Sequence, residues 1–211
     1  MTNFDLRAKD WDADPAKVER ALVVADAIAA EVPLSPATSL FEYGCGTGLL
    51  GFALRERVGR VTLADTSREM LNVLEKKIAA TGATNMTPVE LDLLTSAVPK
   101  AHHDVVCTLM TLHHIDDTDA ILAGFHTVLS PGGYLCISDL DEEDGSFHGA
   151  GFLGHRGFPR GSLGTRLERA GFRNVRFSTV YKVVKDTVTG RRIFPLFLAV
   201  AQKSVAYEAG T

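Results

Sequence analysis

Three glycines at every second position, Gly44, Gly46 and Gly48, stand between a segment with the pattern of a strand and one with the pattern of a helix. A backbone without Cβ atoms can bend sharply there and lets a ligand approach the main chain, and the free amides at a helix start favour negative charge. Residues Gly46 to Gly51 also satisfy GxGxxG, the pattern of dinucleotide-binding loops. The glycines therefore predict a ligand-binding turn without choosing its ligand.

Three carboxylates surround this turn in the sequence. Glu42 precedes the first glycine by two residues, Asp65 ends the second predicted strand, and Asp92 follows the third. The carboxyl ends of parallel strands meet at one edge of a sheet, so these side chains should converge. An acid that ends the second strand can hold the ribose hydroxyls of either NAD or S-adenosylmethionine. Glu42 would repel a pyrophosphate but attract an ammonium and a sulfonium, which favours S-adenosylmethionine.

Two adjacent histidines, His113 and His114, follow the fourth predicted strand. An imidazole titrates near neutral pH, so one of the two is our candidate for a general base or for a group that positions an acceptor. With Asp116 and Asp117 they also suggest metal ligands. Adjacent side chains diverge, however, and no spaced ligand pair stands nearby, so we expect no metal site.

A glycine-rich segment from Asp141 to Gly161 contains three phenylalanines and two histidines and has little periodicity. Long irregular segments in compact domains are typically functional lids or disordered. We interpret this one as a substrate lid in which His148 and His155 contact the acceptor. An acidic run accompanies it, and we expect its carboxylates to be solvated; folded over the site, they would favour a cationic acceptor. The run comprises Asp139, Asp141, Glu142, Glu143 and Asp144.

The elements that must position these residues alternate between short β-branched runs and longer runs of helical period, which predicts βαβ units around a parallel sheet. A short turn at Gly190 indicates an antiparallel hairpin at the end of the chain. Thr66 and Glu69 are placed as a capping box at the start of the helix that follows Asp65. Strands are expected over 38–43, 60–65, 86–91, 104–109 and 134–140, and helices over 14–31, from residue 49, over 121–129 and over 163–170.

Composition bounds the class of protein. The 211 residues carry 22 Lys and Arg against 26 Asp and Glu, and this net charge of −4 argues against a nucleic acid or an anionic membrane as partner. No secretory signal is visible, and the longest apolar run, Leu196–Ala201, is far shorter than the ~20 residues that span a bilayer. We therefore expect a cytoplasmic protein with one domain over 1–211, of which residues 1–36 form a lead and a helix. Cys45, Cys107 and Cys136 are expected to be buried free thiols.

The chain resembles the class I S-adenosylmethionine-dependent methyltransferases, in particular the small-molecule enzymes of ubiquinone and menaquinone biosynthesis. The resemblance covers about residues 38–141 and implies a Rossmann-like α/β fold of three layers, with a seven-stranded, mostly parallel sheet and an antiparallel C-terminal hairpin. It also implies transfer of a methyl group from S-adenosylmethionine to a small-molecule acceptor by in-line displacement. The segments that carry it are EYGCGTG at 42–48, Asp65, LDL at 91–93, TLMTLHHIDD at 108–117 and LSPGGYLCISDLD at 129–141.

The resemblance assigns roles to single residues of this sequence. It implies that Asp65 holds the ribose hydroxyls, that Glu42 lies near the amino group of the methionine part, and that Leu109 faces that part. The other residues that it implies around the cofactor are Gly44, Cys45, Gly46 and Gly48 against the methionine part, Thr66 and Met70 beside the adenine, Asp92 and the amide of Leu93 at the adenine amino group, and Trp11 in a lead that folds over the cofactor.

Two alternatives stay open. An NAD(P)-dependent oxidoreductase would use Gly46, Gly48 and Gly51, and Glu42 and the run from Asp92 to His114 would then be coincidental. A non-catalytic module that binds S-adenosylmethionine as a sensor or scaffold would keep the same glycines and acids.

Overall fold

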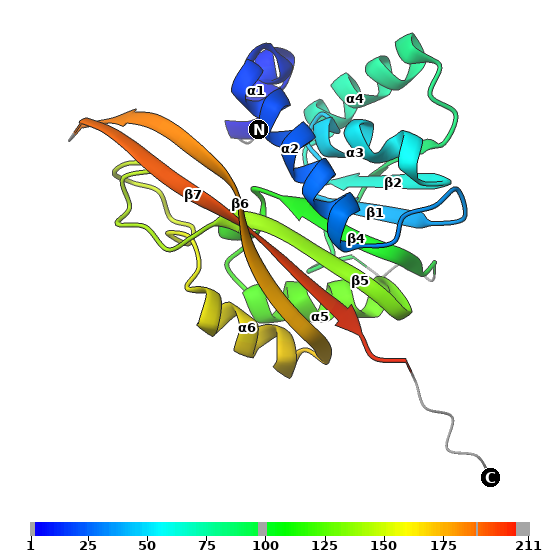
Figure 1. The fold of residues 1–211 in the computed structure, drawn as a ribbon. Helices are drawn as coiled ribbons and strands as arrows, with labels where there is room; N and C mark the ends of the chain where they lie inside the picture. Colours follow the sequence, from blue (N-terminus) through cyan, green and yellow to red (C-terminus); the bar gives the residue numbers. More distant parts are fainter. Residues whose placement is uncertain (1–2, 97–100, 189, 206–211) are drawn as a thin grey trace.

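A seven-stranded sheet runs through the centre of the computed structural model, which describes residues 3–96, 101–188 and 190–205 (Figure 1). Its strands span β1 Ser39–Tyr43, β2 Arg60–Asp65, β3 Met86–Glu90, β4 His103–Leu109, β5 Leu129–Leu140, β6 Phe172–Thr187 and β7 Gly190–Lys203. They lie in the order β3-β2-β1-β4-β5-β7-β6, and every neighbouring pair is parallel except those that β7 forms with β5 and β6. The mostly parallel sheet with an antiparallel C-terminal hairpin is therefore confirmed.

Helices cover both faces of this sheet. They span α1 Asn3–Arg7, α2 Pro15–Glu31, α3 Leu49–Leu54, α4 Arg68–Thr81, α5 Thr118–Val128 and α6 Arg160–Arg169, with 3-10 turns η1 Ala8–Ala13, η2 Arg55–Arg57 and η3 Leu112–His114. One face packs against α2, α3 and α4 and the other against α5 and α6, which confirms the three layers (Figure 1). Side chains alternate along β1 accordingly: Leu40 packs in the core under α2, α3 and α4, and Phe41 packs in the core under α5 and α6. None of the described helices is long and apolar enough to cross a membrane.

The strand order reverses at β1 and β4, because β2 and β3 extend the sheet to one side and β5, β7 and β6 to the other. In such a sheet the connections after the two central strands leave on opposite faces, and ligands bind outside the carboxyl ends of these strands. The glycine turn follows β1, Asp65 ends β2, and His113 and His114 follow β4. The topology therefore brings the residues that the sequence singled out to one edge, which we call the carboxyl edge of the sheet.

Three helices begin where a polar side chain accepts a hydrogen bond from a free amide of the first turn, and at α5 this side chain is Asp117. Pro15 is the first residue of α2, and the Asp14 carboxylate accepts from an amide of that turn at 3.0 Å. At α4 the cap is Ser67, whose hydroxyl accepts from a first-turn amide at 3.3 Å. The prediction that Thr66 caps this helix is wrong by one residue, and Thr66 is exposed.

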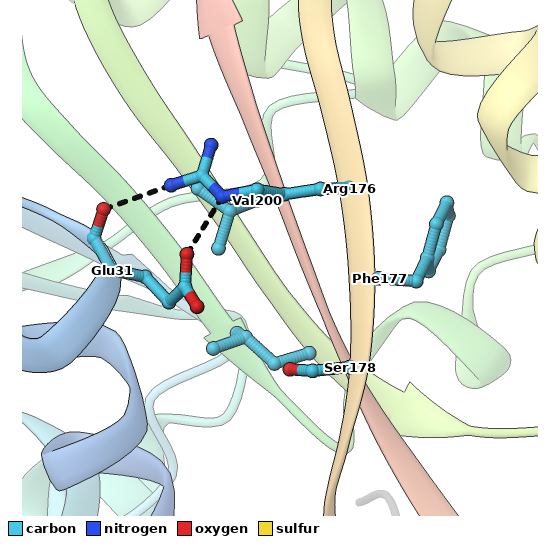
Figure 2. A pocket seen from close by; sticks show the side chains of 6 residues that line it. Glu31, Arg176, Phe177, Ser178 and Val200 are labelled. Carbon is cyan, nitrogen blue, oxygen red and sulfur yellow. Dashed lines mark hydrogen bonds and ion pairs between the residues drawn. The ribbon is translucent and has the colours of Figure 1, made fainter.

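The hairpin of β6 and β7 extends past the parallel part of the sheet and holds neighbouring segments in place (Figure 1). Arg176 of β6 donates to the side chain of Glu31 at 2.7 Å and to its main-chain carbonyl at 2.8 Å, which fastens the end of α2 to the hairpin (Figure 2). Phe194 of β7 packs against Phe147 in the irregular segment between β5 and α6. This segment, residues 141–159, makes up all but the last two residues of the predicted lid at 141–161, which belong to α6, and it rests on the hairpin.

Candidate active site

The glycine turn between β1 and α3 needs glycine at two positions for different reasons. Gly44 has a φ of +67°, and a Cβ on it would stand 2.2 Å from Cγ2 of Thr111. Gly46 has a φ of +54°, but a Cβ there would meet nothing nearer than Met70 Sδ and Trp11 Nε1, both at 3.9 Å. Gly44 therefore closes the turn against the connection after β4, whereas at Gly46 only the positive φ, and not a steric clash, requires glycine.

Two further residues of the turn, Cys45 and Gly48, tie it to its neighbours. Gly48 is the N-cap of α3, and a Cβ on it would stand 2.6 Å from Leu74 of α4. Cys45 is buried, and its amide donates to the carbonyl of Ala64 at 3.0 Å. Burial raises the pKa of the Cys45 thiol, so this group stays protonated and apolar in character.

Asp65 stands beside the turn at the end of β2. Its two carboxylate oxygens accept hydrogen bonds from the amides of Gly46 at 2.7 Å and Ser67 at 2.8 Å. Burial raises the pKa of Asp65, and these amides act against the rise. A carboxylate offers about four acceptor positions, so about two remain for hydroxyl groups of a ligand. The contact with ribose hydroxyls stays a prediction, and this position suits it.

Glu42 lies beneath the turn and points toward α3, where a Cβ on Gly51 would stand 2.8 Å from its Oε2. Only 3% of the residue is exposed, and its Oε2 forms no hydrogen bond with the described part of the chain. Burial raises the pKa of Glu42 to about 8, although the Gly51 amide and Lys77 act in the opposite direction. The predicted proximity to an amino group is not tested by this position. A carboxylate under the turn does favour a cation placed above it.

Asp92 and Leu93 form a turn after β3 that includes Tyr43 of β1, a residue that the sequence analysis missed. Asp92 accepts hydrogen bonds from the Leu94 amide and the Thr95 hydroxyl, both at 2.9 Å. The Tyr43 hydroxyl donates to Asp92 at 3.4 Å and accepts from the Leu93 amide at 3.3 Å. Burial raises the pKa of Tyr43 to about 12. In this structure the Leu93 amide is therefore hydrogen-bonded to the Tyr43 hydroxyl. Its contact with adenine stays a prediction.

The N-terminal lead, made of α1 and η1, lies against the glycine turn. Trp11 is half-buried beside Gly46, and Asp12 accepts hydrogen bonds from the Thr47 hydroxyl and from Lys77 of α4, the latter at 2.7 Å. The lead is thus positioned to cover a ligand at the turn. Direct contact between Trp11 and a cofactor stays a prediction.

His113 lies in η3, four residues after Leu109, the half-buried end of β4. Its Nδ1 is 2.6 Å from Oδ1 of Asp139, and both side chains are buried, with 1% and 0% exposed. Asp139 also accepts from the amide of His113 at 3.2 Å and from that of Leu140 at 2.7 Å. A carboxylate at Nδ1 places the proton there and leaves a lone pair on Nε2. Nε2 is buried and has no hydrogen-bond partner among the described residues.

The expectation that Asp139 belongs to a solvated acidic run is wrong. Asp139 is the penultimate residue of β5, the strand beside β4, and it is fully buried. Its position at the carboxyl end of an apolar strand next to the histidines was the signal that could have found it.

His114 and His148 complete a group of three imidazoles. The ring centroids of His113 and His114 lie 4.1 Å apart, and that of His148 lies 5.0 and 5.3 Å from them. The argument that adjacent side chains diverge is wrong for this pair, because both rings pack against Phe152. His148 also stacks on Phe152 at 3.9 Å. Burial, together with the nearby His113, lowers the pKa of His114 to about 3 and that of His148 to about 4, so both are neutral at pH 7.

The rest of the 141–159 segment is held by its own contacts. His155 is not part of the imidazole group: its Nε2 lies 3.0 Å from the carbonyl of Ile115 and 3.2 Å from the hydroxyl of Thr118. Contact of His148 and His155 with an acceptor stays a prediction. Three further acids of the predicted solvated run are engaged: Asp141 pairs with Arg160 at 2.7 Å, Asp144 pairs with Arg192, and Glu143 accepts from the amides of Gly145 and Phe147.

The segment that forms much of this site is similar in sequence to known proteins. Residues 41–133, which contain the glycine turn and both adjacent histidines, match the family model described as a methyltransferase domain. A ubiquinone biosynthesis O-methyltransferase of Xanthomonas campestris is 32% identical over 141 residues, which cover 65% of this chain and 58% of that protein. An uncharacterized methyltransferase of Mycobacterium tuberculosis is 32% identical over 108 residues, 51% of this chain and 53% of that protein.

The matched part of this chain is therefore similar to the S-adenosylmethionine-dependent methyltransferases. It spans little more than half the length of the curated methyltransferases that it matches. The structure of a phosphoethanolamine N-methyltransferase 2 of Haemonchus contortus with phosphomonomethylethanolamine and S-adenosylhomocysteine has the same fold, with a TM-score of 0.72 at 15% identity over 85% of this chain and 52% of that one. These matches favour a methyltransferase over the NAD(P)-dependent oxidoreductase that the glycine pattern had left open.

The residues at the turn fit the cofactor of this methyltransferase family. A Cβ at Gly46 would make only ordinary van der Waals contacts, Asp65 keeps acceptor positions for hydroxyl groups, and Glu42, whose Oε2 has no hydrogen-bond partner among the described residues, lies beneath. S-Adenosylmethionine carries a sulfonium and an ammonium, which an ionised carboxylate such as that of Asp65 attracts, whereas it repels the pyrophosphate of a dinucleotide.

Proposed function

We propose that this chain transfers a methyl group from S-adenosylmethionine to a nucleophilic atom of a small-molecule acceptor by in-line displacement. The observation that carries the proposal is the buried pair of His113 and Asp139, in which Nε2 of His113 has no hydrogen-bond partner among the described residues. Thr111 links the two places, because its hydroxyl donates to the carbonyl of Gly44 at 3.2 Å two residues before His113.

The chain's own residues have to position two molecules and exclude water. Bound S-adenosylmethionine supplies a methyl group that its sulfonium has already activated. Orientation of the reacting atoms can by itself lower a barrier by ~7 to 11 kcal/mol. The N-terminal lead and the 141–159 segment both contact His114, through Phe4 edge-on at 5.0 Å and through Phe152 at 5.3 Å. These two segments therefore form the cover that keeps water from the transfer.

His113 is the residue that acts on the acceptor. Its Nε2 can accept a hydrogen bond or a proton from an oxygen, nitrogen or sulfur atom of the acceptor. Asp139 holds the ring in one orientation and one tautomer, so that this lone pair is available without rearrangement.

Arg20 of α2 favours an acceptor with a negative charge. Burial lowers its pKa, and Tyr181, Asp14 and, least of the three, Asp139 act in the opposite direction. Its Nε is buried and has no hydrogen-bond partner among the described residues. A guanidinium in this situation gains from a bidentate carboxylate or phosphate. Asp141 and Asp144, which would have favoured a cationic acceptor, are paired with arginines. We therefore expect an acceptor that carries a carboxylate or a phosphate.

Calorimetric titration with S-adenosylmethionine, S-adenosylhomocysteine and NAD tests the cofactor. Release of S-adenosylhomocysteine in the presence of anionic, neutral and cationic hydroxyl, amine and thiol compounds then tests the transfer. The variant His113→Asn keeps an amide donor for Asp139 but lacks Nε2, so it should bind S-adenosylmethionine normally and lose turnover. Tight binding of S-adenosylmethionine without turnover of any acceptor would refute the transfer and favour the non-catalytic module.

A further inference from the structure

Three histidines from two separate segments meet at the acceptor side of the site. His113 and His114 belong to η3 after β4, and His148 belongs to the 141–159 segment. Each offers a ring nitrogen, and these three nitrogen atoms all lie within 4.8 Å of one another. His113 is buried, whereas His148 is exposed on an irregular segment. The group therefore has a buried inner member and an exposed outer one.

The inner histidine is prepared to act as a ligand. Asp139 accepts from its Nδ1 at 2.6 Å, and its Nε2 is buried without a hydrogen-bond partner in the described part of the chain. Histidines that bind metals typically donate their other ring nitrogen to a carboxylate, which sets the tautomer and makes the ligating nitrogen more basic. An unsatisfied nitrogen in a buried position is costly, and a bound ion would satisfy it.

We propose that His113, His114 and His148 bind one divalent transition-metal ion of the zinc type and leave one coordination position open. Imidazole nitrogens suit zinc, copper, iron and nickel rather than magnesium or calcium. Sites with three protein ligands and an open position are the catalytic kind of zinc site. Zinc–nitrogen bonds of ~2.0–2.1 Å require nitrogens closer together than 4.8 Å. A change of the His148 side chain can close this difference, since that side chain is exposed.

The role of this ion in turnover rests on the proposed function, whereas its binding does not. An oxygen, nitrogen or sulfur atom of the acceptor would take the open position, and the ion would lower the pKa of that atom. The imidazoles would then activate the acceptor through the metal instead of by direct contact with Nε2.

Metal binding can be measured on the full chain without any acceptor. The protein is freed of metal with a chelator and titrated with Zn²⁺ in competition with a chromogenic chelator. It is also titrated with Co²⁺, whose visible spectrum reports imidazole ligands in a four-coordinate site. We expect one ion per chain. Affinity should fall by about 10- to 100-fold in Asp139→Asn, which alters the partner of a ligand, and by more in His114→Ala and His148→Ala, which remove ligands.

The variant His102→Ala is the matched control, because His102 is an exposed histidine outside the group. It should keep the affinity of the unaltered chain, and circular dichroism should show all variants folded. Zn²⁺ and Co²⁺ that bind equally well to His114→Ala and His148→Ala, or that bind no chain stoichiometrically, would overturn the metal site. A chain that binds the ion and S-adenosylmethionine but never releases S-adenosylhomocysteine would refute the proposed function and leave the metal site standing.

Discussion

Replacing Glu42 by glutamine should stabilise the fold, and the gain should grow with pH. Burial raises the pKa of Glu42 from 4.5 to about 8. Between these values the unfolded chain ionises this carboxyl while the folded chain keeps it protonated, so the unfolded state binds fewer protons and a rise in pH favours unfolding. Glutamine resembles the neutral acid in shape and does not titrate. The variant Glu42→Gln therefore removes a cost that the unaltered chain bears at neutral and alkaline pH.

The size of this cost follows from the pKa difference. About 3.5 pKa units correspond to about 5 kcal/mol when the group is fully ionised. The cost is absent well below pH 4.5 and complete above pH 8. The gain from Glu42→Gln should thus be about 1 kcal/mol at pH 5, about 3 kcal/mol at pH 7 and near its limit above pH 8.

Urea denaturation of the cofactor-free chain at pH 5, 6, 7 and 8 gives the free energy of unfolding that this prediction concerns. Glu142→Gln serves as the control, because Glu142 is an exposed carboxylate. Other titrating groups act equally on both variants and on the unaltered chain, so the difference isolates Glu42. A difference that does not change between pH 5 and pH 8, or an unaltered chain that is the more stable one at pH 8, would refute the reasoning.

Three further predictions concern the glycine turn, the pair of His113 and Asp139, and the hairpin of β6 and β7. Gly46→Ala and Gly82→Ala both place a side chain at a positive φ, +54° and +65°, and should each cost about 1–2 kcal/mol of stability; only Gly46→Ala should also weaken S-adenosylmethionine binding in calorimetry. Asp139→Asn should reduce turnover by a factor of about 10²–10⁴ at unchanged S-adenosylmethionine affinity, because the imidazole loses its fixed tautomer; full turnover would contradict this role. Arg176→Ala should cost less than about 1 kcal/mol in thermal denaturation, since its bond to Glu31 is 42% and 40% exposed.

Several element boundaries could not be predicted because they depend on partners. The first strand, expected over 38–43, spans Ser39–Tyr43, and the hairpin turns at Gly190 as expected. The fifth strand begins at Leu129 instead of Tyr134, because Leu129 pairs with His103 before a register shift in the neighbouring strand. Such pairing is set by the partner strand and leaves no periodic signal in the local sequence.

The cysteines show the opposite case. Cys45, Cys107 and Cys136 are buried and free, as predicted. Their burial follows from their place in or beside apolar strands, which local pattern reveals.

Local sequence patterns were enough to predict the parallel sheet and the glycine turn. They also predicted that Glu42, Asp65, Asp92 and the adjacent histidines lie at one edge of the sheet. These features follow from the alternation of strands and helices and from the backbone demands of glycine, which are local. Only the tertiary structure shows which side chains are in contact. The buried Asp139 contacts His113, 26 residues away, and His148 lies beside His113 and His114. Such contacts depend on how separate loops pack at the end of the sheet, and no periodicity within either loop encodes the position of the other.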